Sequence, residues 1–192
     1  MLREILVLLK DTVNNHLNVI SGRDGTQPEQ EYVVFIESES ADALPLKLGA
    51  VTLLLVNLEE DHTLRPADPY RQMTPGGMTL RVQPPIYMSA FILFVARYKD
   101  YEQSLRNISS ILHFFQSHRA FDRSSMPALS DRIGQITIEL LTLPFAEQNN
   151  LWSTLRCSYQ PSLLYRIRMA IFQDEEGASI PPVMEPTTRI SP

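Results

Sequence analysis

The sequence predicts an α+β fold in which a single mixed β-sheet of about five strands carries helices packed mainly on one face. Two observations support this prediction. Apolar residues recur at the three-to-four spacing of helices in some segments and at the two-residue spacing of strands in others. These segments follow one another as helix, strand, strand, strand, helix, strand, helix and strand, an order typical of an α+β domain.

The first helix is expected over residues 2–20, where one apolar stripe runs along about five turns. Gly22 and the polar run to Gln30 end it. Residues 32–36 form a short apolar run rich in β-forming side chains, which predicts a strand. Residues 50–58 are almost continuously apolar, so we expect a second, central strand that is covered on both faces.

Residues 61–85 are rich in proline and contain Gly76-Gly77, which predicts a long loop. A loop of this length inside a compact domain is usually functional or disordered. Within it, Met78 to Val82 can form the arm of an edge hairpin. The next segment, Ile86 to Ala96, is the longest strand candidate and is apolar on both faces.

Asp100 is placed to cap a second helix that runs to about His118. The apolar residues of this helix alternate by four and three, which predicts a coiled-coil-like seam that Ile111 and Phe114 widen. The seam residues are Tyr101, Leu105, Ile108, Leu112 and Phe115.

The last third of the chain predicts strand, helix and strand. Ile136, Ile138 and Leu140 alternate in the first of these strands. Pro144 opens a short helix at its first turn. Its inward-facing residues are expected to be Phe145, Leu151, Trp152 and Leu155.

The final strand carries two arginines on one face. Arg166 and Arg168 alternate with apolar residues, which face the other way. The apolar residues are Leu163, Tyr165, Ile167, Met169 and Ile171. From Gln173 onward the chain is acidic and proline-rich, so we divide it into a folded domain, 1–172, and a flexible tail, 173–192.

Composition and charge exclude several classes of function. Hydrophobic residues make up 44% and charged residues 20% of the 192, as in soluble globular domains. The net charge of −5 offers no attraction to nucleic acid or anionic lipid. One cysteine, Cys157, fits a reducing compartment, and the longest apolar stretch falls short of the ~18 residues that span a membrane. We therefore expect a protein that is cytoplasmic when made.

No pattern indicates catalysis, a cofactor or a metal. The densest polar cluster is Glu59-Glu60-Asp61-His62, but no second ligand pair stands at a helical or strand repeat, and a solvated acidic turn is the simpler interpretation. His113 and His118 are five residues apart on one helix and cannot share a metal.

Two interpretations of Arg166 and Arg168 stay open. They lie on a solvated sheet face, or they pair with the carboxylates of Glu59 or Glu60, within the chain or across a subunit boundary. Only three of the 17 basic residues are lysine, and arginine is the cation favoured at protein–protein interfaces. Codon bias explains the same excess of arginine equally well.

Three blocks of sequence together resemble the cap, or tail-terminator, family of contractile injection systems of the antifeeding-prophage type. The first block is Leu53 to Asp61 followed by Leu64-Arg65. The second runs from Pro85 through Ala96 and continues with Asp100 to Glu102 and Ile111 to His118, with Phe121. The third is Asn149-Asn150-Leu151-Trp152 and Tyr159 to Arg168. The resemblance covers roughly residues 2–172.

The resemblance implies a structural protein with the fold of a phage tail terminator. It implies a hexameric ring that ends the inner tube and the sheath at the end distal to the baseplate, with terminal tube and sheath proteins as partners. It implies no enzyme activity, cofactor, nucleic acid or small-molecule substrate. The charged residues expected at protein contacts are Glu59, Glu60, Arg65, Arg71, Arg81, Arg166 and Arg168.

Two alternatives remain at this point. One is an assembly chaperone or binding module that loads sheath, tube or cargo and then leaves the particle. The other is a metal-dependent hydrolase that uses Glu59, Glu60, Asp61 and His62.

Overall fold

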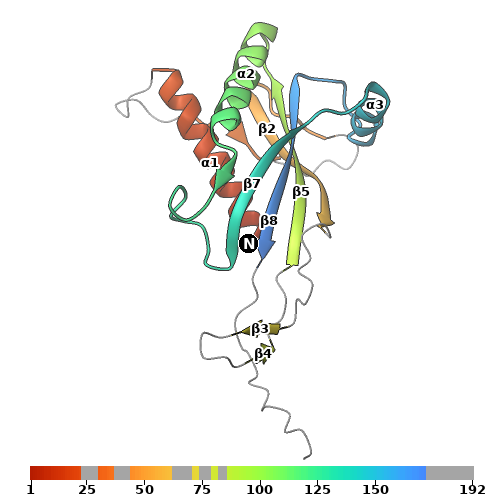
Figure 1. The fold of residues 1–192 in the computed structure, drawn as a ribbon. Coiled ribbons are helices and arrows are strands. Elements are labelled where there is room, and N and C mark those ends of the chain that lie inside the picture. The colour runs from red at the N-terminus through yellow and green to blue at the C-terminus, as the bar shows by residue number, and fades with distance from the viewer. Residues whose placement is uncertain (23–29, 37–43, 62–70, 74–78, 82–85, 172–192) are drawn as a thin grey trace, which may run out of the picture.

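A six-stranded mixed sheet with three helices forms the fold, as Figure 1 shows. The computed structural model describes residues 1–22, 30–36, 44–61, 71–73, 79–81 and 86–171. Its elements are α1 (Leu2–Ile20), β1 (Val33–Val34), β2 (Ala50–Glu60), β3 (Arg71–Met73), β4 (Thr79–Arg81), β5 (Ile86–Arg97), α2 (Tyr101–Ser117), β6 (Ala120–Phe121), β7 (Ile133–Leu141), α3 (Phe145–Thr154) and β8 (Ser162–Ile171).

The strand order of the main sheet is β1-β2-β5-β8-β7-β6. β1 runs parallel to β2, and every other neighbouring pair is antiparallel. β3 and β4 form a separate two-stranded hairpin. The predicted α+β class and mixed sheet are confirmed, and the sheet has one strand more than the expected five because β6 is too short to leave a sequence pattern.

The two faces of the sheet carry different helices. α1 and α2 lie side by side on one face, and α3 lies on the other (Figure 1). The larger core packs between α1, α2 and the sheet and includes Leu9, Ile111, Phe94 and Ile167. The smaller core lies under α3 and includes Leu46, Leu54, Leu93, Val95 and Trp152.

Only the first half of β2 is buried. Ala50 to Leu54 are buried, whereas the strand from Leu55 to Glu60 is mostly exposed, with Leu58 43% exposed. The expectation that this strand is covered on both faces is therefore wrong for its second half. Leu58 lies opposite Ala90, on the face of α1 and α2, so the larger core does not cover this end of β2. On the other face the smaller core includes Leu54 and Leu93 but no buried residue from the second half of β2.

The buried face of α2 is rotated away from the predicted seam. Asp100 caps the helix as expected, because its Oδ1 accepts a hydrogen bond of 3.0 Å from the Glu102 N–H. Tyr101 and Leu105, however, are 64% and 43% exposed. The buried residues are Ser104, Asn107, Ile108, Ile111, Phe114 and Phe115. Small polar side chains thus allow the close approach of the helix to its neighbours, and the apolar spacing gave the wrong face for the first turns.

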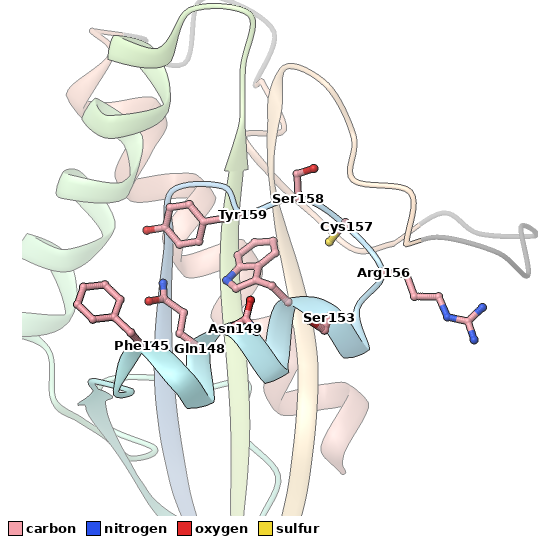
Figure 2. Close-up of a pocket in the computed structure, with 9 residues that line it drawn as sticks. Phe145, Gln148, Asn149, Ser153, Arg156, Cys157, Ser158 and Tyr159 are labelled. Atoms are coloured by element: carbon pink, nitrogen blue, oxygen red, sulfur yellow. The ribbon is translucent and has the colours of Figure 1, made fainter.

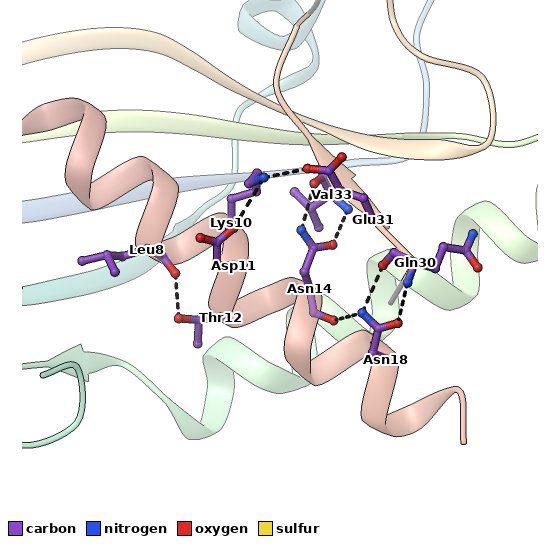
Figure 3. A network of polar contacts seen from close by, with 9 residues as sticks. All are labelled: Leu8, Lys10, Asp11, Thr12, Asn14, Asn18, Gln30, Glu31 and Val33. Carbon is purple, nitrogen blue, oxygen red and sulfur yellow. Dashed lines mark hydrogen bonds and ion pairs between the residues drawn. The ribbon is translucent and has the colours of Figure 1, made fainter. Parts of the chain in front are cut away.

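Buried asparagines join β1 to α1 (Figure 3). The Asn14 side chain donates to the Val33 carbonyl at 3.0 Å and accepts from the Val33 N–H at 2.7 Å. Asn18 makes the same double contact with the backbone of Gln30, at 3.0 and 3.1 Å. These bonds satisfy backbone groups in and beside β1. β1 has only two residues, so it is shorter than the predicted strand 32–36.

Candidate interaction surface

The part of the sheet face that α3 leaves uncovered carries alternating charges. β8 buries Tyr165, Ile167 and Met169 under α1 and α2, so Arg166 and Arg168 point to the opposite face, as the sequence predicts. The flanking strands add Glu139 from β7 and Asp61 just after β2. We call Asp61, Ser89, Glu139, Arg166 and Arg168 the charged sheet face.

Strand register explains why these residues meet. Arg166 lies directly opposite Glu139 on β7, and Arg168 lies directly opposite Ser89 on β5. Ser89 in turn lies opposite Glu59 on β2. Glu59 is therefore two strands, about 10 Å, from the backbone of Arg168, and its Oε1 accepts a hydrogen bond from the Asn57 side chain instead.

The two arginines are held by carboxylates of the same chain. Arg166 Nη2 lies 2.6 Å from Glu139 Oε2, and Arg168 Nη2 lies 3.9 Å from the same oxygen. Arg168 Nε lies 3.4 Å from Asp61 Oδ2, and the Ser89 hydroxyl donates to that oxygen at 3.3 Å. The expectation that Glu59 or Glu60 pairs with these arginines within the chain is corrected here: Glu139 and Asp61 take that place.

The ion pairs shift the proton equilibrium of Glu139. The hydrogen bond from Arg166 and then the positive charges of Arg166 and Arg168 hold the pKa of the Glu139 carboxyl below its usual range, against the opposing effect of partial burial. Glu139 is therefore an anion near neutral pH and remains available as an acceptor, with 54% of its side chain exposed.

Each arginine also keeps an unsatisfied donor. The Nε atoms of Arg166 and Arg168 are buried and make no hydrogen bond within the described part of the chain. For Arg168 the distance to Asp61 is short enough for charge attraction, but it lacks hydrogen-bond geometry. An unsatisfied buried N–H is costly, so these two atoms reduce the stability of the face. They have no accessible surface, so contacts with a partner fall to the exposed parts of the guanidinium groups.

The remaining predicted contact residues are spread over the molecule. Glu59 lies on the same face as the arginines, and its Oε1 accepts from the Asn57 side chain at 2.7 Å. Glu60 alternates to the face of α1 and α2. Arg71 and Arg81 occupy directly opposed positions in the β3–β4 hairpin. The last one, Arg65, lies outside the described residues.

The predicted contact residues did not include Glu139, Ser89 or Asp61, and Asp61 was considered only as a metal ligand in the acidic cluster. Glu139 alternates with Ile136 and Ile138, and that spacing alone placed it on the polar face of its strand. What the sequence could not supply was the pairing of β7 with β8, which brings Glu139 next to Arg166 across 27 residues.

The structure gives no support for a metal site at the acidic cluster. Among the described residues, no group of three or more His, Cys, Asp or Glu side chains could hold a metal ion. His62 lies outside them. None of the helices in the described residues combines the length and the apolar character that spanning a lipid bilayer requires.

A pocket of about 770 Å³ lies between α3 and the loop that follows it (Figure 2). Phe145 and Gln148 line it from α3, and Arg156 and Tyr159 line it from the loop. Trp152, 5% exposed, is buried as predicted, but Phe145 is 90% exposed, so its predicted inward orientation is wrong. Phe145 begins the helix beyond the edge of the smaller core, where no sheet residue can cover it.

Comparisons with known proteins place this geometry in context. The family described as the Pvc16 N-terminal domain matches residues 4–185. The fold is similar to the cryo-EM structure of the anti-feeding prophage cap, a tube-terminating cap, with a TM-score of 0.54, 16% sequence identity, and coverage of 95% of this chain and 60% of that chain.

It is also similar to the PVC sheath/tube terminator of an extracellular contractile injection system in its extended state, with a TM-score of 0.55, 14% identity, and coverage of 94% of this chain and 63% of that chain. The chain thus spans less than two thirds of the length of either structure. No curated protein sequence matches it.

Proposed function

The chain belongs to the Pvc16 N-terminal domain family, and we propose that it caps the tube and sheath of a contractile injection particle. The membership confirms the resemblance drawn from the three sequence blocks. The observation that carries the proposal is the match of the whole described fold to a tube-terminating cap and to a sheath/tube terminator. In this proposal the protein acts by binding and performs no catalysis.

A cap needs two unlike surfaces. One surface must fit the last ring of a polymer, and the other must not offer that ring's own binding surface again, because a repeated head-to-tail contact would let the polymer continue. The proposed assembly is a hexameric ring at the end distal to the baseplate. It contacts the terminal tube and sheath proteins and couples one to the other, within a particle that is released or anchored.

The charged sheet face is our candidate for a subunit or ring contact. It combines alternating charges with side chains that stay partly exposed, Arg168 at 38% and Glu139 at 54%, so charged groups of a partner can pair with them. Glu59 extends this face by one strand. We assign Arg71 and Arg81, which the β3–β4 register places opposite each other, to a second contact with an acidic partner surface. Arg65 and Glu60 complete the proposed contacts.

The proposal is tested by removing the chain from the particle. Particles assembled without it are expected to have tubes and sheaths of irregular length, or sheaths detached from their tubes. Normal, uniform particles with intact sheaths in its absence would overturn the proposal. A purified chain that is monomeric would be no contradiction, because ring closure can use the tube end as a template.

A further inference from the structure

We propose that the pocket between α3 and its following loop binds the proline-rich segment Ile180–Pro186 of a neighbouring copy of the chain. The proposed ring supplies that neighbour, so the inference rests on the proposed function for the source of the segment. The binding chemistry itself belongs to the pocket and to the segment, and it can be measured without a particle.

Three of the nine described residues that line the pocket are aromatic: Phe145, Trp152 and Tyr159. The Trp152 and Tyr159 rings meet edge to face with their centroids 5.4 Å apart. Tyr159 is 58% exposed, and Phe145 on the first turn of α3 is 90% exposed (Figure 2). A nearly fully exposed phenylalanine beside two further aromatic rings is an apolar surface that a partner can cover.

The pocket also offers hydrogen-bonding groups. Trp152, 5% exposed, is one of its lining residues and carries an indole N–H, which is a donor only. Gln148 and Asn149 add side-chain amides from α3 to the same wall. These groups can donate to backbone carbonyls of a bound peptide.

Exposed aromatic rings beside side-chain N–H donors are the chemistry that binds polyproline II segments. Such segments carry prolines that pack against aromatic rings, and their backbone carbonyls point outward without internal hydrogen bonds. Ile180-Pro181-Pro182-Val183-Met184-Glu185-Pro186 has this composition. The match to the family runs to residue 185, so it includes nearly all of this segment.

Charge favours the same occupant. Among the described residues that line the pocket, Arg156 alone is charged. The last twenty residues contain four acidic residues and one arginine, and Glu185 falls within the proline-rich segment itself. An Arg156–Glu185 pair at the rim would fix the direction of the bound segment.

Chain length favours a neighbouring copy as the source of the segment. β8 begins near the pocket and runs away from it, ending at Ile171 at the far end of the sheet (Figure 1). From Ser162 to Ile171 there are nine residue steps, which span about 30 Å. From Ile171 to Ile180 there are nine residue steps, which reach about 30–32 Å at full extension. To bring the start of the segment back to its own pocket, a chain would have to run fully extended along the whole sheet. We therefore assign the segment to the pocket of an adjacent subunit in the proposed ring.

A peptide titration tests the binding. Trp152 is the only tryptophan, so its emission reports on the pocket directly. The full-length variant P181S/P182S/E185K, whose own segment no longer competes, is titrated with a peptide of residues 176–190. We expect a saturable change in Trp152 emission. Emission that stays unchanged up to about 1 mM peptide, a concentration that detects even weak binding, would overturn the proposal.

Matched variants test the charge pairing. Adding Arg156→Glu to the tail variant is expected to weaken peptide binding about 3- to 10-fold, because an exposed ion pair becomes a repulsion. Arg119→Glu makes the same charge change on the exposed residue before β6 and is expected to leave the affinity unchanged. Equal effects of the two substitutions would show that net charge controls binding and would overturn the specific contact with Arg156.

Cross-linking identifies which copy supplies the segment. Cys157 is the only cysteine and lines the pocket, so Val183→Cys in the full chain adds one possible partner. A short bismaleimide should link the Cys157 thiol to the introduced thiol at position 183 of another copy, which gives dimers and larger species on denaturing gels. Cross-links within one chain would overturn the neighbour assignment. The same would follow if the variant that also carries Arg156→Glu gave as many cross-links between copies. The two proposals can fail separately. If the peptide binds the pocket but particles assembled without the chain are normal, only the capping function is rejected.

Discussion

Reversing both arginines of the charged sheet face separates a role in assembly from a role in folding. In the variant R166E/R168E, the new carboxylates face Glu139 and Asp61. The side chains being replaced are on the surface of the sheet and contribute no apolar contact to the larger core, whose β8 residues are Tyr165, Ile167 and Met169. We expect the variant to fold and to fail in assembly.

The cost to folding follows from exposure. Glu139 is 54% exposed and Arg168 38% exposed, so each lost ion pair is worth at most about 1 kcal/mol. Like charges placed directly opposite on neighbouring strands add a penalty of similar size. Asp61 is only 9% exposed, so the loss of its ion pair with Arg168 costs more stability than the loss of an exposed pair. The sum is about 1–3 kcal/mol, against about 5–15 kcal/mol for a typical domain.

Urea unfolding followed by Trp152 emission measures this cost, and microscopy of particles measures assembly. R166Q/R168Q is the matched control, because it removes the charges without creating repulsion. Its free energy of unfolding should be about 1 kcal/mol higher than that of R166E/R168E, and thus nearer to that of the natural chain. Normal particles built from R166E/R168E would show that the arginines are only a solvated face. A chain that no longer folds would show that the ion pairs are structural and that the energy estimate is wrong.

Three further predictions concern the body of the fold. Trp152→Ala should lower the free energy of unfolding by about 3–5 kcal/mol, because the ring is only 5% exposed, and an unchanged urea midpoint would contradict this burial. Asn14→Ala should cost about 2–3 kcal/mol by leaving two backbone groups of β1 unsatisfied, whereas the exposed neighbour Asn15→Ala should cost little. Burial lowers the pKa of His16, which packs against Phe114, so the folded state binds fewer protons and loses stability as pH falls below about 6.5. His16→Phe should therefore flatten the dependence of the unfolding free energy on pH between about 7 and 5. An equally steep dependence in this variant would assign the pH effect to another group.

The sequence predicted those elements whose signal is local. Residues 2–20 show an apolar stripe long enough to define a helix without help from the rest of the chain, and α1 has the same bounds. β8 alternates cleanly, so the opposite directions of Ile167 and Arg166 followed from the two-residue period. Asp100 indicated the start of α2 through a capping bond within three residues.

Features that depend on distant segments escaped the sequence. The face of α2 that packs inward is set by how closely α1 and β5 approach, so the small polar Ser104 is buried while the apolar Leu105 is exposed. Phe145 lies outward because the core under α3 ends before it. The ion pair of Arg166 with Glu139 required knowledge of which strand β8 pairs with. The division of the chain at residue 172 stays a prediction.

Imaging the end of the finished particle tests the central proposal most directly. We expect a hexameric ring of this chain at the end distal to the baseplate, in contact with the last tube and sheath subunits. Finished particles that contain no copy of the chain would contradict the account and would instead indicate a chaperone that leaves after assembly.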